Sequence, residues 1–292
     1  MASLTAIEKK PLAAQAPAVS RPWLAAATLG QREWVRFIRQ PNRVFGAIGQ
    51  PVIFWLLFGA GLGPSFRIAG QDGARLSYGE YFFPGSLILI LLFTAIFATI
   101  SVIEDRREGF LQSVLVAPIP RWSMVLGKVA GGSLIALVEG LIFLALGLTI
   151  GLHFSVGSLL AIVVLLALVA LALTSLGFVI AWNMDSTQGF HAVMSVFLMP
   201  MWLLSGAFFP PAPLSQTTSW MEWSLALVIA LNPLTYGVAG LRRLLYLDGA
   251  SAPLPEGLPE LSTCWFMTLG FAVVMFVLAS LTARRRTTGD LL

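Results

Sequence analysis

Residues 82–103 read FFPGSLILILLFTAIFATISVI, a stretch of 22 residues without a charged side chain. A helix needs about 20 mostly apolar residues to cross the roughly 30 Å hydrocarbon core of a bilayer. This stretch is therefore expected to span a membrane. Working outward from it, five more stretches have the same character, at about 44–63, 123–150, 158–182, 190–209 and 261–282. The sequence predicts an all-α polytopic membrane protein with six transmembrane helices.

The composition excludes the soluble classes of protein. Of the 292 residues, 57% are hydrophobic and 11% are charged, and the mean hydropathy is +0.84. A soluble domain carries about 25% charged residues, so a soluble enzyme, a disordered chain and a water-soluble scaffold are excluded. The net charge is +4, but the 18 basic residues form no stripe of the kind that binds nucleic acid. We expect membrane lipids around the chain and no nucleic-acid partner.

The placement of the basic residues predicts an orientation. Fourteen of them lie before the first span, between the second and third spans or after the sixth, and four lie on the opposite side. Connections rich in Lys and Arg stay in the cytoplasm, so both termini and the 104–122 loop are expected there. We divide the chain into a flexible cytoplasmic tail (1–26), a transmembrane domain (27–286) and a second cytoplasmic tail (287–292). The first segment lacks the apolar core of a cleaved signal peptide.

An amphipathic segment, 29–43, precedes the first span. A basic face beside an aromatic one is typical of a helix that lies in the membrane interface. A plain basic flank that only sets orientation is the alternative. The basic face would hold Arg32, Arg36, Arg39 and Arg43, and the other face Trp34, Phe37 and Ile38.

The loop between the second and third spans begins with five consecutive charges and continues as a short amphipathic helix. Pro118 and Pro120 end that helix. A short exposed helix that is apolar on one side needs a surface to pack against, and the lipid interface and a cytoplasmic partner protein are equally compatible with it. The residues concerned are Glu104, Asp105, Arg106, Arg107, Glu108, Gly109, Phe110 and Leu111.

The outer connection, 210–260, is too long for a simple link. Trp220 and Trp223 suit a position at the membrane interface. The apolar run 225–231 is too short to span and stops at Asn232-Pro233. We expect one or two re-entrant helices that dip into the outer leaflet.

Glu139 lies deep in the third predicted span. Ionisable residues at membrane depth are costly and usually mark a pathway or a partner. A role in a transport pathway and a hydrogen bond to the backbone of a neighbouring helix both remain open for Glu139. On the same helix, Gly127 and Gly131 form a GxxxG pattern that favours close helix packing.

The fifth span is rich in methionine and aromatic residues. Met194, Phe197 and Met201 are candidates for the lining of an adaptable apolar pathway. Packing against a neighbouring subunit is the alternative explanation for the same residues.

No catalytic constellation is visible. His153, His191 and Cys264 are isolated from one another and form no metal-ligand pattern. Gly127-Lys128 resembles the end of a phosphate-binding loop, but the upstream glycine and the following Ser or Thr are missing. We expect neither a catalytic centre nor a metal or other cofactor on this chain.

Several short motifs, weak individually, occur in a characteristic order over about residues 30–285. The chain thereby resembles the permease subunit of ABC-2 type exporters, a group that includes daunorubicin-resistance, nodulation-factor and polysaccharide-export permeases. The motifs are Phe83-Pro84-Gly85-Ser86, Glu104 to Gly109 with Ala117-Pro118-Ile119-Pro120-Arg121, Val125-Leu126-Gly127-Lys128, Leu204-Ser205-Gly206-Ala207-Phe208-Phe209-Pro210, Asn232-Pro233-Leu234-Thr235 and Leu241-Arg242.

The resemblance implies the fold of a type V ABC exporter in a bacterial inner membrane. Residues Glu104 to Leu115 would form the coupling helix, with ATPase contacts as far as Leu111, and about 214–243 the re-entrant outer helices. The permease would dimerise with a second copy or a paralogue, across a seam that involves spans one and five. Two separate ATPase subunits would hold ATP and Mg, and the cargo would be an amphipathic, lipid-like or glycan-lipid compound. Relatives are expected to carry an uncharged polar residue near Glu139, which favours a substrate-specific role for it.

A second class of function stays open. An ion-gradient-driven secondary transporter or channel would use Glu139 as its proton-coupling group. That class predicts transport without any ATPase subunit.

Overall fold

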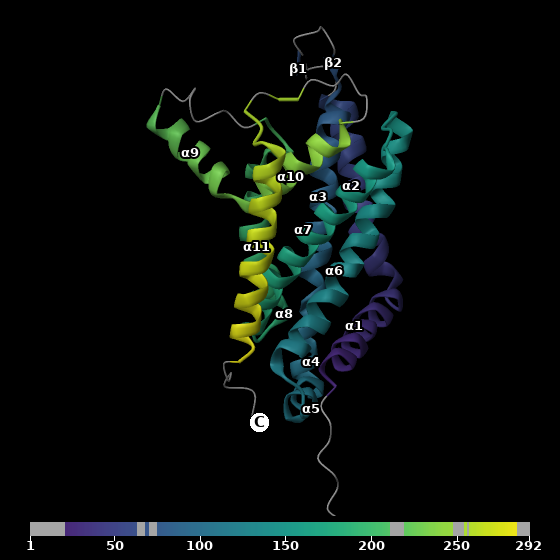
Figure 1. The fold of residues 1–292 in the computed structure, drawn as a ribbon, viewed down its shortest axis with the longest axis vertical. Coiled ribbons are helices and arrows are strands. Elements are labelled where there is room, and N and C mark those ends of the chain that lie inside the picture. Colours follow the sequence, from purple (N-terminus) through teal and green to yellow (C-terminus); the bar gives the residue numbers. More distant parts are fainter. Residues whose placement is uncertain are drawn as a thin grey trace, which may run out of the picture.

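The computed structural model describes residues 21–62, 68–69, 75–210, 219–247, 254–255 and 257–284. In these ranges the chain is a bundle of helices with one two-residue antiparallel hairpin at one end (Figure 1). The tails predicted at 287–292 and for most of 1–26 lie outside the described residues. The elements are α1 (Pro22–Ile38), α2 (Pro41–Leu62), β1 (Ile68–Ala69), β2 (Arg75–Leu76), α3 (Tyr78–Ala98), α4 (Ile100–Arg107), α5 (Phe110–Val116), α6 (Arg121–Leu146), η1 (Gly147–Ile150), α7 (Val156–Trp182), α8 (Thr187–Trp202), the π-helical turn η2 (Leu203–Ala207), α9 (Trp220–Leu231), α10 (Pro233–Leu245) and α11 (Leu261–Thr282).

Five helical segments are long and apolar enough to cross a membrane: α3 with α4, α6 with η1, α7, α8 with η2, and α11. The remaining predicted span corresponds to α2, in which the shorter Pro51–Leu62 part is distinctly apolar. Its full 22 residues rise about 33 Å, which matches a hydrocarbon core of roughly 30 Å. When α2 is counted, six helical segments run from one end of the bundle to the other. As a result, α1 and the last turn of α11 lie at the same end of the bundle (Figure 1). We call this the α5 end and the other the α10 end.

Helix α1 begins earlier than the predicted domain boundary at residue 27. Pro22 stands in the first turn, where its missing N–H is not needed, so residues 22–26 are helical and do not belong to a flexible tail. The helix packs closely along α6. A Cβ on Gly127 would lie 2.6 Å from the carbonyl oxygen of Ala26, and one on Gly131 2.9 Å from the Cβ of Glu33. The GxxxG pattern is therefore a packing face, as predicted.

Helix α3 forms the core of the bundle. From Tyr81 to Leu92 its side chains are buried, and α2, α6 and α7 all contact it. A helix that is apolar on every side is one that is surrounded. The uncharged stretch 82–103 is thus apolar mainly because protein covers it, and only secondarily because it lies in a membrane-spanning segment.

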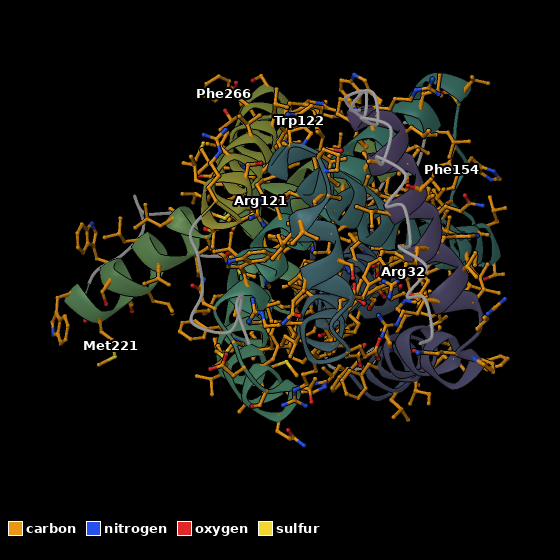
Figure 2. The ribbon with its side chains drawn as sticks, turned by 90° about the horizontal axis from the view of Figure 1, so that it is seen from below. Arg32, Arg121, Trp122, Phe154, Met221 and Phe266 are labelled. Carbon is orange, nitrogen blue, oxygen red and sulfur yellow. The ribbon has the colours of Figure 1, made fainter. Side chains whose placement is uncertain are left out.

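The predicted break at Asn232-Pro233 is present at the α10 end. The side chain of Asn232 accepts a hydrogen bond from the backbone N–H of Leu234 at 3.1 Å, and α9 and α10 meet there at 73°. Helix α9 projects away from the bundle, with Met221 near its outer end (Figure 2), while α10 packs against α7 and α11. A bent pair of this kind is the geometry of a broken span or a re-entrant loop.

Candidate functional site

Asp105 is the centre of a charged cluster at the α5 end. The last turn of α4 holds it, and its side chain is fully buried. Arg32 binds it with two hydrogen bonds of 2.7 and 2.9 Å, and Arg36 binds it at 3.1 Å. The ammonium of Lys128 on α6 also donates to Asp105. One carboxylate therefore joins α1, α4 and α6.

Further carboxylates complete the cluster. Glu33 accepts from Lys128 at 2.7 Å, and Glu104 accepts from Arg36 at 2.7 Å. Three cations thus face three anions, as buried charges require if they are to be offset. Lys128 was counted with the charges at the cytoplasmic start of the third span, but it lies buried inside α6. A lysine between Gly127 and Val129 in an apolar run is the only sequence signal for this.

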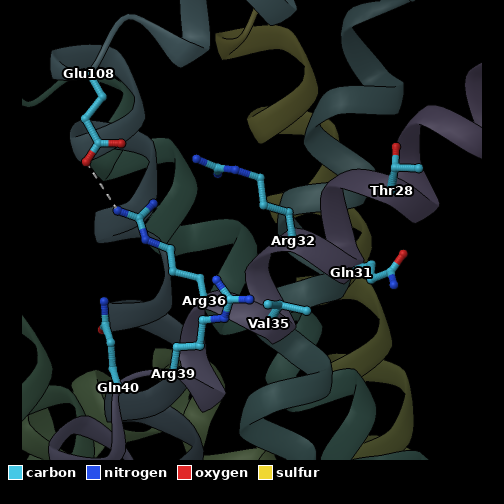
Figure 3. A pocket seen from close by; sticks show the side chains of 8 residues that line it. All are labelled: Thr28, Gln31, Arg32, Val35, Arg36, Arg39, Gln40 and Glu108. Carbon is cyan, nitrogen blue, oxygen red and sulfur yellow. Dashed lines mark ion pairs between the residues drawn. The ribbon is translucent and has the colours of Figure 1, made fainter.

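The basic face of α1 meets these carboxylates, so it is not simply a lipid-facing surface. Beside the cluster, α1 lines a groove of about 700 Å³ in which Glu108 approaches Arg36 (Figure 3). Arg39 lies exposed on this groove, Phe37 is buried and Trp34 is half-buried. Burial lowers the pKa of Arg32, but the hydrogen bond and charge of Asp105 outweigh that effect and raise it. The guanidinium lies 3.8 Å over the ring of Phe110.

The predicted coupling segment divides into buried and exposed residues. Gly109 turns the chain between α4 and α5 with φ at +77°, a conformation that favours glycine. Asp105 and Leu111 are buried, so these two side chains cannot touch a partner, contrary to the sequence-based expectation. The exposed residues are Arg107 and Glu108 in the predicted segment, and Ser113, Val116 and Pro118 after Leu111.

Val116 ends α5 with 84% of its surface exposed. The segment predicted from the resemblance runs from Glu104 to Leu115, with ATPase contacts expected as far as Leu111, so it does not include Val116. The two prolines that follow give the only sequence signal, because they force the chain to leave the helix at this point.

Arg106 ties the same segment to a fourth part of the bundle. Its guanidinium donates to the carbonyl oxygens of Trp182 at 2.7 Å and Met184 at 3.2 Å, where α7 ends. Arg107 donates to the carbonyl of Asp185 at 3.0 Å. Through these contacts and those of Asp105, α4 is attached to α1, α6 and the α7–α8 turn.

The pathway candidates do not form one lining. Glu139 is buried in α6 and accepts a hydrogen bond from the hydroxyl of Thr94 of α3, so this partner on a neighbouring helix is a side chain and not the backbone group considered above. In α8, Met194 is fully buried, Phe197 is 65% exposed and Met201 is half-buried. The helix thus points Met194 into the core and Phe197 away from it, where it is available to lipid or another subunit.

The described residues contain no group of three or more His, Cys, Asp and Glu side chains that could hold a metal ion. The carboxylates of the α5 end are already bound to Arg32, Arg36 and Lys128. Charge balance of this kind serves structure and coupling between helices.

A bundle of helices long and apolar enough to cross a membrane, with a charged cluster at one end, is the architecture of a multi-pass membrane protein. The sequence profile of the ABC-2 type transporter family matches residues 25–246, so the chain belongs to that family. It is similar to the putative transport permease ycf38 of Cyanophora paradoxa, with 27% identity over 217 residues, 73% of this chain and 71% of that protein.

Two bacterial relatives have comparable similarity. Nodulation protein J of Rhizobium leguminosarum bv. viciae is 28% identical over 200 residues, which cover 66% of this chain and 73% of that protein. The inner membrane transport permease YadH of Escherichia coli (strain K12) is 25% identical over 223 residues, 75% and 82% of the two chains. The chain is therefore the permease of an ABC transporter, a class that works with an ABC ATPase.

Proposed function

We propose that this permease belongs to an ATP-driven exporter, which moves an amphipathic, lipid-like or glycan-lipid compound out of the cytoplasm or the inner leaflet. Two copies, or one copy and a paralogue, form the pathway. Two separate ATPase subunits bind at the α5 end and hold the ATP and Mg. The protein resides in a bacterial inner membrane with both termini in the cytoplasm.

The attachment of α5 is the observation that supports this proposal. The helix stands at the tip of the bundle, where Val116 offers an apolar contact, and Asp105 and Arg106 anchor the segment before it to three other parts of the fold. Charge-assisted hydrogen bonds are shorter and stronger than neutral ones. Movement of an ATPase against α5 would therefore be transmitted to α1, α6 and α7.

Val116→Glu is expected to weaken binding of the ATPase about tenfold or more, because a charge placed at an apolar contact costs over 1 kcal/mol. The fold should be unaffected, since Val116 is 84% exposed. The measurement is the amount of ATPase that co-purifies with the permease, together with ATP-dependent transport in vesicles.

Val156→Glu is the matched control. Val156 is 78% exposed and begins α7, at the end of the bundle opposite α5. This variant should retain one ATPase per permease. Equal retention of the ATPase by both variants, with transport intact, would show that α5 is not the docking element.

Glu139→Gln separates the exporter from the ion-gradient alternative. A glutamine oxygen can still accept the hydrogen bond from Thr94, so ATP-driven transport should stay within about twofold of wild type, as for an exchange that preserves the bond. Transport is measured in vesicles with ATP, without ATP and with a protonophore. Transport that needs no ATP and disappears in this variant would establish the ion-gradient mechanism instead.

A further inference from the structure

Arg242 of α10 is a buried cation at the opposite end from the charged cluster. Its side chain is 1% exposed, and its guanidinium lies 4.1 Å over the ring of Tyr81. One nitrogen, Nη2, donates to the carbonyl oxygens of Tyr81 and Gly206, each at 3.2 Å. Over the described part of the chain, Nε and Nη1 find no hydrogen-bond acceptor. The guanidinium therefore has unused donors in a buried place.

The charge of Arg242 is also unbalanced. Among the described residues, no carboxylate oxygen lies within 4.0 Å of it, whereas Lys128 at the α5 end contacts two carboxylates. Glu80 lies at the same end as Arg242, but its carboxylate is engaged by the backbone and hydroxyl of Ser77 at 2.8 and 2.7 Å. Burying an arginine without an anion lowers the stability of a fold. A contribution to stability therefore does not explain why Arg242 is buried.

The neighbourhood of Arg242 is apolar and aromatic. Tyr78, Phe82, Trp202 and Phe208 form a cluster of mutual ring contacts with centroids 5.5 to 6.2 Å apart. The hydroxyl of Tyr81 donates to the carbonyl of Gly206 at 2.9 Å, which links Arg242 to the turn η2 that follows Trp202. A single buried cation beside a group of packed aromatic rings is complementary to an amphipathic anion.

Two backbone irregularities border this region. Gly206 has φ of +76° inside the π-helical turn η2, and α10 is joined to α9 through the 73° bend at Asn232. π-helical turns are frequent at functional sites, and chain segments of this kind can absorb a change of angle. Arg242 is buried where α10 contacts α3 and η2, so a ligand reaches it only when these elements separate.

We propose that Arg242 binds the acidic group, a carboxylate, sulfate or phosphate, of an amphipathic anion as it passes the α10 end. The apolar part of the same molecule packs against the aromatic cluster of Tyr78, Phe82, Trp202 and Phe208. This inference rests on the transport function proposed above and adds an acidic group to its cargo class.

The test uses the permease with its co-purified ATPase in phosphatidylcholine nanodiscs. The probe is 1-pyrenebutyrate, and 1-pyrenebutanol is its uncharged match. Energy transfer from tryptophan to pyrene reports binding without any need for ATP or transport. Wild type should bind the acid about tenfold or more tightly than the alcohol, as expected for a charge-assisted hydrogen bond.

Arg242→Gln should lose this preference, because glutamine keeps an N–H donor for the two carbonyls but removes the charge. Arg242→Lys should retain most of it, and it also decides the matter if the glutamine variant does not fold. Arg243→Gln is the matched control: Arg243 donates to the carbonyls of Pro259 at 2.7 Å and Leu258 at 2.9 Å, and its loss should leave the preference intact.

Equal binding of acid and alcohol by wild type, or an unchanged preference in Arg242→Gln, would overturn the inference and leave Arg242 as a structural bracket between α10, α3 and η2. The exporter proposal would survive that result if the ATPase still co-purifies and transport still needs ATP. Conversely, an acid preference that depends on Arg242, in a permease that binds no ATPase and transports without ATP, would uphold the site and refute the exporter proposal.

Discussion

Replacing Asp105 by alanine is expected to lower the free energy of unfolding by about 3–5 kcal/mol, the usual cost of removing one partner from a buried ion pair. The fully buried carboxylate binds Arg32, Arg36 and Lys128. Without it, Lys128 keeps Glu33 as its carboxylate partner and the hydroxyl of Ser101 at 3.4 Å, and Arg32 loses both of its short hydrogen bonds. The contacts between α1, α4 and α6 should loosen together.

Cys264 provides the measurement, because it is the single cysteine of the chain and is fully buried in α11. A maleimide dye labels it only as the protein opens, so heating the solubilised protein gives an unfolding midpoint. Asp185→Asn is the control: its fully exposed carboxylate lies 3.9 Å from Arg106, and exposed pairs contribute little. Equal midpoints for the two variants would contradict the central role given to Asp105.

Gly85→Val is expected to prevent stable folding, at a cost of about 3 kcal/mol or more from overpacking. A Cβ at Gly85 would lie 2.7 Å from both the Cβ and the carbonyl oxygen of Ala207 and 2.9 Å from its Cα. These are mostly backbone atoms, which cannot move aside as a flexible side chain would. The contact holds η2 against α3, and the indole of Trp202 donates to the carbonyl of Gly85 across it at 2.8 Å.

Gly270→Val is the matched control for this substitution. Gly270 lies in α11, and nothing comes within 4 Å of a Cβ built on it. The same Cys264 labelling on heating, with the yield of monodisperse protein, should leave this variant close to wild type and show Gly85→Val largely unfolded. A stable Gly85→Val protein would mean that η2 can separate from α3 without loss of the bundle.

Local patterns predicted much of the architecture. The apolar stretch 82–103 became the core helix, the prolines at 118 and 120 follow the end of α5, and Asn232-Pro233 marks the bend between α9 and α10. Each of these features depends on residues that are close in the sequence. Hydropathy, capping and the missing proline N–H act over a few residues, so they can be read without a structure.

The charged residues were predicted less well. Counting basic residues assigned Lys128 to the start of the third span and Arg242 to the outer side, but it did not predict that both side chains are buried. The arginines of α1 were predicted to form the basic face of an interfacial helix, and that pattern did not predict their contacts with carboxylates. Lys128 and Glu33 are 95 residues apart in the sequence, and Arg242 and Tyr81 are 161 apart. No local pattern reports contacts of that separation.

The sequence by itself determined that this protein lies in a membrane, which segments form its membrane-spanning helices and where those helices end. These properties are local, because the transfer of a segment to lipid and the termination of a helix depend on residues that are neighbours in the sequence. Only the tertiary structure determined where the few charged side chains lie and which partners they have. It gathers Arg32, Asp105 and Lys128 from three helices into one charged cluster, and it buries Arg242 where no carboxylate of the described residues pairs with it. In a low-dielectric interior, the energy of a charge depends on which opposite charge lies within a few ångströms, and packing alone sets that distance.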